Sequence, residues 1–239
     1  MTGTLVNVLL IIVGSIIGLL FRRKLKQRIL DGLMSVMGIA VLVIGVTGAV
    51  KTGDMLCMIV SLAIGTFVGE GLNIEKRLES AGNAMHKLFS RFNTSSTDNR
   101  FTEGFVSATV LFCVGAMAVM GSLEAGVSHD YTILFSKGII DGVTSIAFAA
   151  ALGIGVIFSA VSVGIYQGAI TLLAVWVAPY LSQTAVAEMS AAGSVVIIGI
   201  AINMLGLGKK KLNVGNMLPS VFIPLAYIPL VEWISGLIK

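Results

Sequence analysis

The sequence predicts an all-α polytopic membrane protein with about eight transmembrane helices. Hydrophobic residues make up 56% of the 239 residues and charged residues only 12%, and the mean hydropathy is +0.98. A soluble domain normally contains about 25% charged residues, so most of this chain cannot face water. One crossing of the hydrocarbon core takes about 20 apolar residues. The length therefore allows eight spans and one modest loop, without a separate soluble domain.

Long apolar runs, separated by charged and turn residues, define the expected spans. The boundary between the fifth and sixth spans depends only on the turn-forming residues Ser159, Ser162 and Gly164, because the surrounding sequence is uncharged. In chain order the expected spans are 4–21, 32–50, 55–72, 104–122, 138–158, 161–179, 193–208 and 217–236.

Positive charge is distributed unevenly between the loops. All but three of the 16 lysines and arginines lie in the segments 22–28, 76–100 and 209–211. Because positively charged loops stay on the cytoplasmic side, we expect these segments in the cytoplasm and both termini outside. The first segment follows the first apolar run instead of preceding it, which indicates an uncleaved span and not a signal peptide. The net positive charge thus reflects membrane orientation, and we expect no nucleic-acid partner.

The longest loop divides the chain. Between Ile74 and Phe92, apolar side chains recur at helical spacing among charged ones, and a polar linker over 93–99 follows. This pattern predicts an amphipathic helix in the cytoplasmic interface. The expected organisation is a first membrane unit of three spans (1–72), the amphipathic helix and linker (73–103), a second unit of three spans (104–182) and a C-terminal two-span hairpin (183–239).

Spans two and five share a sequence pattern. Residues 29–46 align with residues 139–156 with nine of 18 positions identical, including a shared Asp-Gly-x-x-Ser. The expected topology gives these two spans opposite directions, so the two three-span units would form an inverted 3+3 repeat. Helix breaks in such repeats expose backbone groups to a solute, and Gly153 and Gly155 are the candidates for a break here.

Polar side chains inside the expected spans are the candidates for binding a solute or an ion. Asp141, Thr144 and Ser145 share one face of span five, because they are spaced i, i+3 and i+4. An acid inside a membrane is a functional-site hypothesis by default, and the alternative is that Asp141 hydrates the outer end of its helix. The further candidates are Asp31 and Ser35 in span two, and Tyr166, Gln167 and Thr171 in span six.

A structural role, instead of solute binding, could also explain these further candidates. Asp31 could simply pair with Arg28, which lies close to it in the sequence. Gln167 and Thr171 lie one helical turn apart and must be hydrogen-bonded in lipid, so they either join helices or line a path.

An enzyme is the main alternative class, and the sequence argues against it. It contains no His-Glu-x-x-His, no Gly-x-Ser-x-Gly and no phosphate-binding loop. The two histidines, His86 and His129, are expected on opposite sides of the membrane. An aspartyl dyad needs carboxyl groups about 3 Å apart, whereas the topology places Asp31 and Asp141 near opposite faces. We therefore expect no catalytic residue, no cofactor and no metal site.

Four segments resemble a known family. They are Cys113–Glu124, Lys137–Phe148, Gly153–Ala160 and Tyr166–Leu173, and they are similar to segments of the YdfK/YqgA-like bacterial membrane proteins, a family with a domain of unknown function (554). The resemblance covers essentially the whole chain. It implies an inner-membrane protein of bacteria, and it supplies neither a substrate nor functional residues.

The expected function is that of a secondary transporter for a small solute or ion, coupled to a proton or Na⁺. The alternatives are a passive channel and a non-transporting membrane sensor or partner protein that docks through the basic helix 74–92. Glycine is abundant, 28 of 239 residues, and Gly-x-x-x-Gly pairs permit close helix approach. We therefore expect lipid contacts and a homodimer, the commonest closed assembly.

Overall fold

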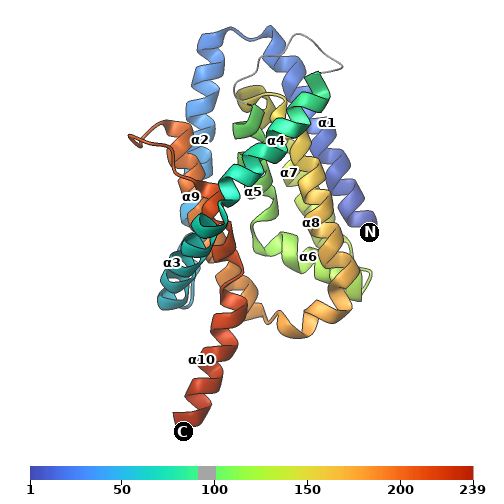
Figure 1. Ribbon diagram of the computed structural model, residues 1–239. Coiled ribbons are helices and arrows are strands. Elements are labelled where there is room, and N and C mark those ends of the chain that lie inside the picture. Colours follow the sequence, from blue (N-terminus) through green and yellow to red (C-terminus); the bar gives the residue numbers. More distant parts are fainter. Residues whose placement is uncertain (91–100, 239) are drawn as a thin grey trace.

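The computed structural model describes residues 1–90 and 101–238, and within these residues it contains helices and no strands (Figure 1). Seven of the described helices are long and apolar enough to cross a membrane, and the bent pair α5 and α6 would make an eighth. The predicted fold class is therefore confirmed. The elements are α1 (Thr2–Lys24), α2 (Gln27–Ala49), α3 (Met55–Leu72), α4 (Ile74–Ser90), α5 (Phe101–Cys113), α6 (Ala116–Val127), α7 (Thr132–Leu152), α8 (Gly155–Val177), η1 (Ala178–Tyr180), α9 (Gln183–Leu205), η2 (Val214–Val221) and α10 (Pro224–Ile238).

The helices pack as two groups, which lie to the right and left in Figure 1. In the first group α1 packs along α7, and α5 and α6 pack against α8. In the second group α2 packs along α9, and α3 packs against η2. Contacts between the groups are less extensive and come mainly from α2 with α7 and from α6 with α9.

Glycines allow the closest helix contacts in both groups. A Cβ atom added at Gly14 of α1 would overlap the carbonyl oxygen of Gly142 in α7, and one added at Gly18 would overlap that of Ile146. In the second group, a Cβ at Gly69 of α3 would overlap the carbonyl oxygen of Asn216. Within a membrane, hydrophobic burial does not drive helices together. Small residues there let the helix backbones approach closely and pack. The Gly-x-x-x-Gly pair at the α1–α7 contact is thus a packing feature inside the chain.

The fourth span is not the continuous helix that the sequence predicted over 104–122. α5 ends at Cys113, α6 begins at Ala116, and their axes differ by 61°. Gly115 has a φ of 127°, a backbone conformation that side-chain-bearing residues rarely adopt. Hydropathy is insensitive to such a break, because both halves are apolar.

The helix does break at Gly153 and Gly155, but the break is the turn between two helices and not an interruption within one span. α7 ends at Leu152 and α8 begins at Gly155, and the turn between them uses Gly153 with a φ of 89°. The predicted turn near Ser159 and Gly164 instead lies inside α8. Glycine is needed at 153 for its positive φ, and at 155 because a Cβ there would overlap the carbonyl oxygen of Phe101.

Several helices begin earlier than predicted, and in α7 and α9 a side-chain hydrogen bond marks the new start. α7 begins at Thr132 instead of 138, after Asp130, whose carboxylate accepts from the Thr132 N–H at 2.9 Å. α9 begins at Gln183 instead of 193, after Ser182, whose hydroxyl caps the Ala185 N–H at 3.1 Å. Both extensions place polar residues inside helices, where hydropathy had suggested loops.

α4 confirms the predicted amphipathic helix as far as Ser90. It runs diagonally across the bundle from the end of α3 (Figure 1) and contacts α5 and η2. The last predicted positions of this helix, 91–92, and the linker 93–99 lie outside the described residues.

Candidate functional site

A buried ion pair marks the centre of the first helix group. Lys137 and Asp141 lie one turn apart on α7, with only 6% and 5% of each residue exposed, and the Lys137 ammonium donates to Asp141 Oδ2. The same oxygen accepts from Asn7 Nδ2 of α1 at 3.1 Å. Asn7 Nδ2 also lies 3.3 Å from Gln167 Oε1 of α8. The polar chain Lys137–Asp141–Asn7–Gln167 therefore joins three helices.

Two residues of this polar chain, Lys137 and Asn7, were not among the candidates from the sequence. The predicted span began at 138, so Lys137 was assigned to an outer loop. The signal that could have found it is the i, i+4 spacing of Lys137 and Asp141, which places opposite charges on one helical face. A charge buried away from water is tolerated only when it is paired and hydrogen-bonded, and both partners meet that condition here.

Several polar atoms close to the polar chain have no hydrogen-bond partner within the part of the protein that the structure describes. Asn7 Oδ1 and Gln167 Nε2 are both buried and unpaired, as are Thr4 Oγ1 and Thr171 Oγ1. Thr4 lies one turn before Asn7 on α1, and Thr171 one turn after Gln167 on α8. Buried polar groups normally have a partner, so this region has unused capacity for hydrogen bonding.

Ser145 has a different role from its predicted partners Asp141 and Thr144. Its hydroxyl lies 2.8 Å from the carbonyl oxygen of Gly142 and 3.2 Å from that of Ile11 in α1. It therefore helps to hold α7 against α1 and does not face an open space.

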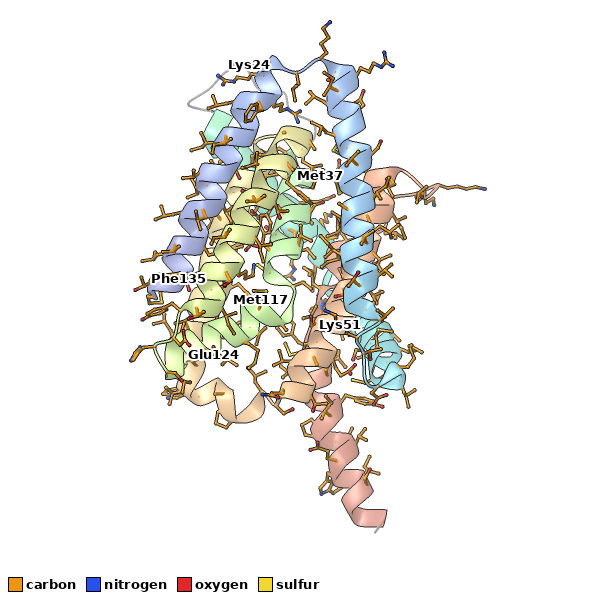
Figure 2. All side chains as sticks on the ribbon, turned by 180° about the vertical axis from the view of Figure 1, so that it is seen from behind. Lys24, Met37, Lys51, Met117, Glu124 and Phe135 are labelled. Atoms are coloured by element: carbon orange, nitrogen blue, oxygen red, sulfur yellow. The ribbon has the colours of Figure 1, made fainter. Side chains whose placement is uncertain are left out.

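A cavity of about 490 Å³ that is open on one side lies between the two helix groups, and we call it the central cavity. Several of its lining residues, among them Val43, Lys51 and Ile140, are exposed. Its walls come from α2 and the turn after it, the α5–α6 break, α7 and α9. Figure 2 labels two of its lining residues, Met117 and Lys51, on the two facing groups. Besides Lys137 and Asp141, its polar lining residues are Thr47, Lys51, Thr144, Ser190 and Ser194.

The α5–α6 break forms one wall of the central cavity. Residues 111, 112 and 114–118 line the cavity, and the Ala116 N–H at the start of α6 lies 3.3 Å from Ser190 Oγ of α9. A helix end leaves its last backbone groups without intrahelical partners. At membrane depth, such non-helical backbone is tolerated only inside the protein or along a polar cavity.

The remaining candidates from the sequence lie elsewhere. Asp31 and Ser35 are exposed near the start of α2, where Asp31 Oδ1 accepts from Gln27 Nε2 at 2.9 Å. Neither of them lines the central cavity. Tyr166 lines a separate, mainly apolar pocket of about 520 Å³ with residues of α5 and η2. Thus Asp141, Thr144 and Gln167 come together around α7, whereas the shared motif of span two does not join them.

Glu188 is a second buried acid that the sequence reasoning missed, because the predicted span began after it. It lies on α9 with 2% of the residue exposed. Its carboxylate accepts from Thr52 Oγ1 at 2.6 Å and from the backbone N–H groups of Gly53 at 2.7 Å and Asp54 at 3.2 Å. These bonds hold the turn between α2 and α3 against α9, which is a structural role.

Comparison with known proteins places the chain in a family. It is 34% identical over 228 residues to the "Uncharacterized membrane protein YdfK" of Bacillus subtilis, with 94% of both chains covered. It is 27% identical over 221 residues to the "Uncharacterized protein YqgA" of Escherichia coli, with 92% of this chain and 93% of that protein covered. No solved structure matches. The family model "Protein of unknown function (DUF554)" matches residues 2–228, and the chain therefore belongs to this family.

Proposed function

We propose that the protein is a secondary transporter that moves a small solute or ion across the bacterial inner membrane. The observation that carries this proposal is the buried Lys137–Asp141 pair in the wall of the central cavity, which the α5–α6 break also lines. Ionisable residues within a membrane are costly and mark substrate or ion pathways.

The cavity has the properties expected of a transport site. Its volume of about 490 Å³ lies within the range of small-molecule sites. Interrupted helices near the membrane midplane are the usual place where transporters bind solutes and coupling ions. The α5–α6 pair supplies such an interruption, with Gly115 at the break.

The two helix groups suggest how access could alternate. The central cavity lies between them, and the contacts within each group are more extensive than the contacts across. Rocking one group against the other would open the cavity first to one side of the membrane and then to the other. The inverted relation of residues 29–46 and 139–156 remains a prediction, as does a cytoplasmic location for the three basic segments.

Reconstitution into proteoliposomes tests the proposal. Purified protein would be challenged with concentration jumps of Na⁺, inorganic phosphate, amino acids and short carboxylates, with tracer uptake and charge movement as readouts. We expect saturable uptake of at least one of these solutes, and its loss in Asp141→Asn.

Asp31→Asn is the matched control, because it makes the same chemical change at an exposed site that does not line the central cavity. It should retain wild-type uptake. Wild-type uptake by a folded Asp141→Asn protein would remove Asp141 from the mechanism, and currents that grow linearly with concentration without saturation would indicate a channel.

The expected homodimer also remains part of the proposal. α10 carries exposed apolar side chains, including Trp233 and Ile234, and these would meet either lipid or a second copy of the chain. The alternative of a membrane sensor that docks through α4 predicts no solute movement with any member of the panel.

A further inference from the structure

We infer that the central cavity binds a small monocarboxylate, and that Asp141 takes up one proton when this anion pairs with Lys137. The inference rests on the proposed transport function and names its substrate class and its coupling ion.

The charges around the cavity favour an anion. Two lysines, Lys51 and Lys137, line it, against a single carboxylate, Asp141, among the described residues. Since Asp141 and Lys137 neutralise each other, Lys51 leaves an excess of one positive charge among the lining residues, at the turn that Glu188 holds from outside the cavity. Lys51 is exposed, so water screens its charge, whereas the charge of the buried Lys137 is screened much less.

The N-terminus of α6 contributes further positive potential to the cavity. α6 has 12 residues and begins at Ala116 in the cavity wall. The first N–H groups of a helix carry partial positive charge and attract anions. The Ala116 N–H already donates to Ser190 Oγ, so a carboxylate would accept from the Lys137 ammonium, and the α6 N-terminus would contribute positive potential. The hydroxyls of Ser190 and Ser194 lie in the same cavity.

A cation fits the site poorly. Asp141 Oδ2 already accepts from Lys137 and from Asn7 Nδ2. A Na⁺ ion at this carboxylate would have to displace the ammonium and would then lie beside it. No second carboxylate lines the cavity in the described part of the chain to offset that repulsion.

Anion binding changes the charge balance at Asp141. A carboxylate that pairs with Lys137 would share one ammonium with the Asp141 carboxylate, and two like charges in a buried site repel each other. Protonation of Asp141 from bulk water removes the repulsion: one carboxylate and one proton give one carboxylic acid. Asn7 Nδ2 can still donate to the carbonyl oxygen of this acid. The anion and the proton therefore bind together, and their joint movement carries no net charge.

The other groups around Asp141 do not substitute for it as the proton acceptor. Asn7 of α1 and Gln167 of α8 do not titrate. Lys137 and Lys51 are cations, and the other titratable neighbour of Asp141 among the described residues is the thiol of Cys113 at the end of α5, which lines the separate apolar pocket. A thiol is neutral at physiological pH, so it cannot act as the base at pH 6–7.

The decisive measurement is the pH dependence of lactate binding. The dissociation constant of lactate for detergent-purified protein would be measured between pH 5.5 and 7.5 by calorimetry, with the neutral amide lactamide as the comparison ligand. Uptake of one proton with the anion predicts affinity that falls about tenfold for each unit rise in pH. We expect lactamide not to compete with lactate.

Variants separate the roles of the two charges. Asp141→Asn should bind lactate with an affinity independent of pH, because the amide cannot take up a proton. The double variant Lys137→Met/Asp141→Asn, which leaves no unpaired charge at this site, should not bind lactate. Asp31→Asn should keep the wild-type pH slope. Lactate binding without a pH slope in the wild type, or an unchanged slope in Asp141→Asn, would overturn the inference.

Transport is then measured separately in proteoliposomes that contain a pH-sensitive dye, with protein-free liposomes as the control for passive entry of lactic acid. A lactate gradient should acidify the lumen faster when the protein is present. If another solute moves but lactate neither binds nor acidifies the lumen, the inference fails while the transporter proposal stands. If no solute moves at all, the transporter proposal fails. The pH dependence of the lactate affinity then still decides whether the cavity binds lactate together with a proton.

Discussion

Replacing Lys137 with methionine should destabilise the protein strongly and in a pH-dependent way. The variant keeps an unbranched side chain that is one atom shorter, but it leaves Asp141, only 5% exposed, with Asn7 as its remaining donor among the described residues. Removing one partner of a buried ion pair costs about 3–5 kcal/mol. The carboxylate can avoid this full penalty by becoming protonated. The free energy of that protonation therefore sets an upper limit on the loss of stability caused by the unpaired charge.

This upper limit on the loss of stability follows from the pKa of aspartic acid in water. In water its pKa is about 3.9, and each pH unit above that value adds about 1.4 kcal/mol to the cost of protonation. At pH 7 the limit is therefore about 4 kcal/mol, and at pH 5 it falls to about 1.5 kcal/mol. Because the folded variant holds a proton that the unfolded chain releases, its stability decreases as the pH rises above about 4.

Equilibrium unfolding in detergent micelles, followed by circular dichroism at pH 5 and pH 7, measures this effect. Lys24→Met is the matched control, since Lys24 is exposed at the end of α1, and it should change the free energy of unfolding by less than about 0.5 kcal/mol. Lys137→Met/Asp141→Asn should return to within about 1 kcal/mol of the wild type. A loss below about 1 kcal/mol at pH 7 for Lys137→Met, or a loss that does not change with pH, would refute the argument that this pair is shielded from water.

Three further predictions concern other parts of the chain. Glu188→Ala should lower the free energy of unfolding by about 2–4 kcal/mol, because it removes three hydrogen bonds of a charged group in the α2–α3 turn. Gly115→Ala should cost about 1–3 kcal/mol and reduce uptake, since a φ of 127° is strained for alanine. Burial raises the pKa of Glu75 above its ordinary value of 4.5. Its contribution to stability should therefore decline as the pH rises above that value, and Glu75→Gln should remove this decline in an unfolding series between pH 4 and 7.

Each of these predictions has an outcome that contradicts it. A Glu188→Ala protein with wild-type stability would mean that the carboxylate does not hold the turn. Wild-type stability in Gly115→Ala would show that the break tolerates a side chain. An unchanged pH profile in Glu75→Gln would assign the decline to another group.

The sequence by itself was sufficient for the α-helical membrane class, for most of the spans and for the amphipathic helix α4. Each of these depends on side-chain periodicity or on hydropathy averaged over many residues, and both are properties of a local stretch of chain. Asp141 could also be singled out, because an acid is rare within an apolar run.

Only the tertiary structure showed what surrounds Asp141. Asn7 donates to Asp141 and to Gln167 across 134 and 160 residues of chain, and no local pattern contains those separations. Lys137 and Glu188 resembled loop residues, because hydropathy does not register a partner that neutralises or hydrogen-bonds a charge. The α5–α6 break depends on the φ angle of one glycine between two apolar halves. Averaged hydropathy is insensitive to a single dihedral angle, so the central cavity could be found only once the helices were packed together.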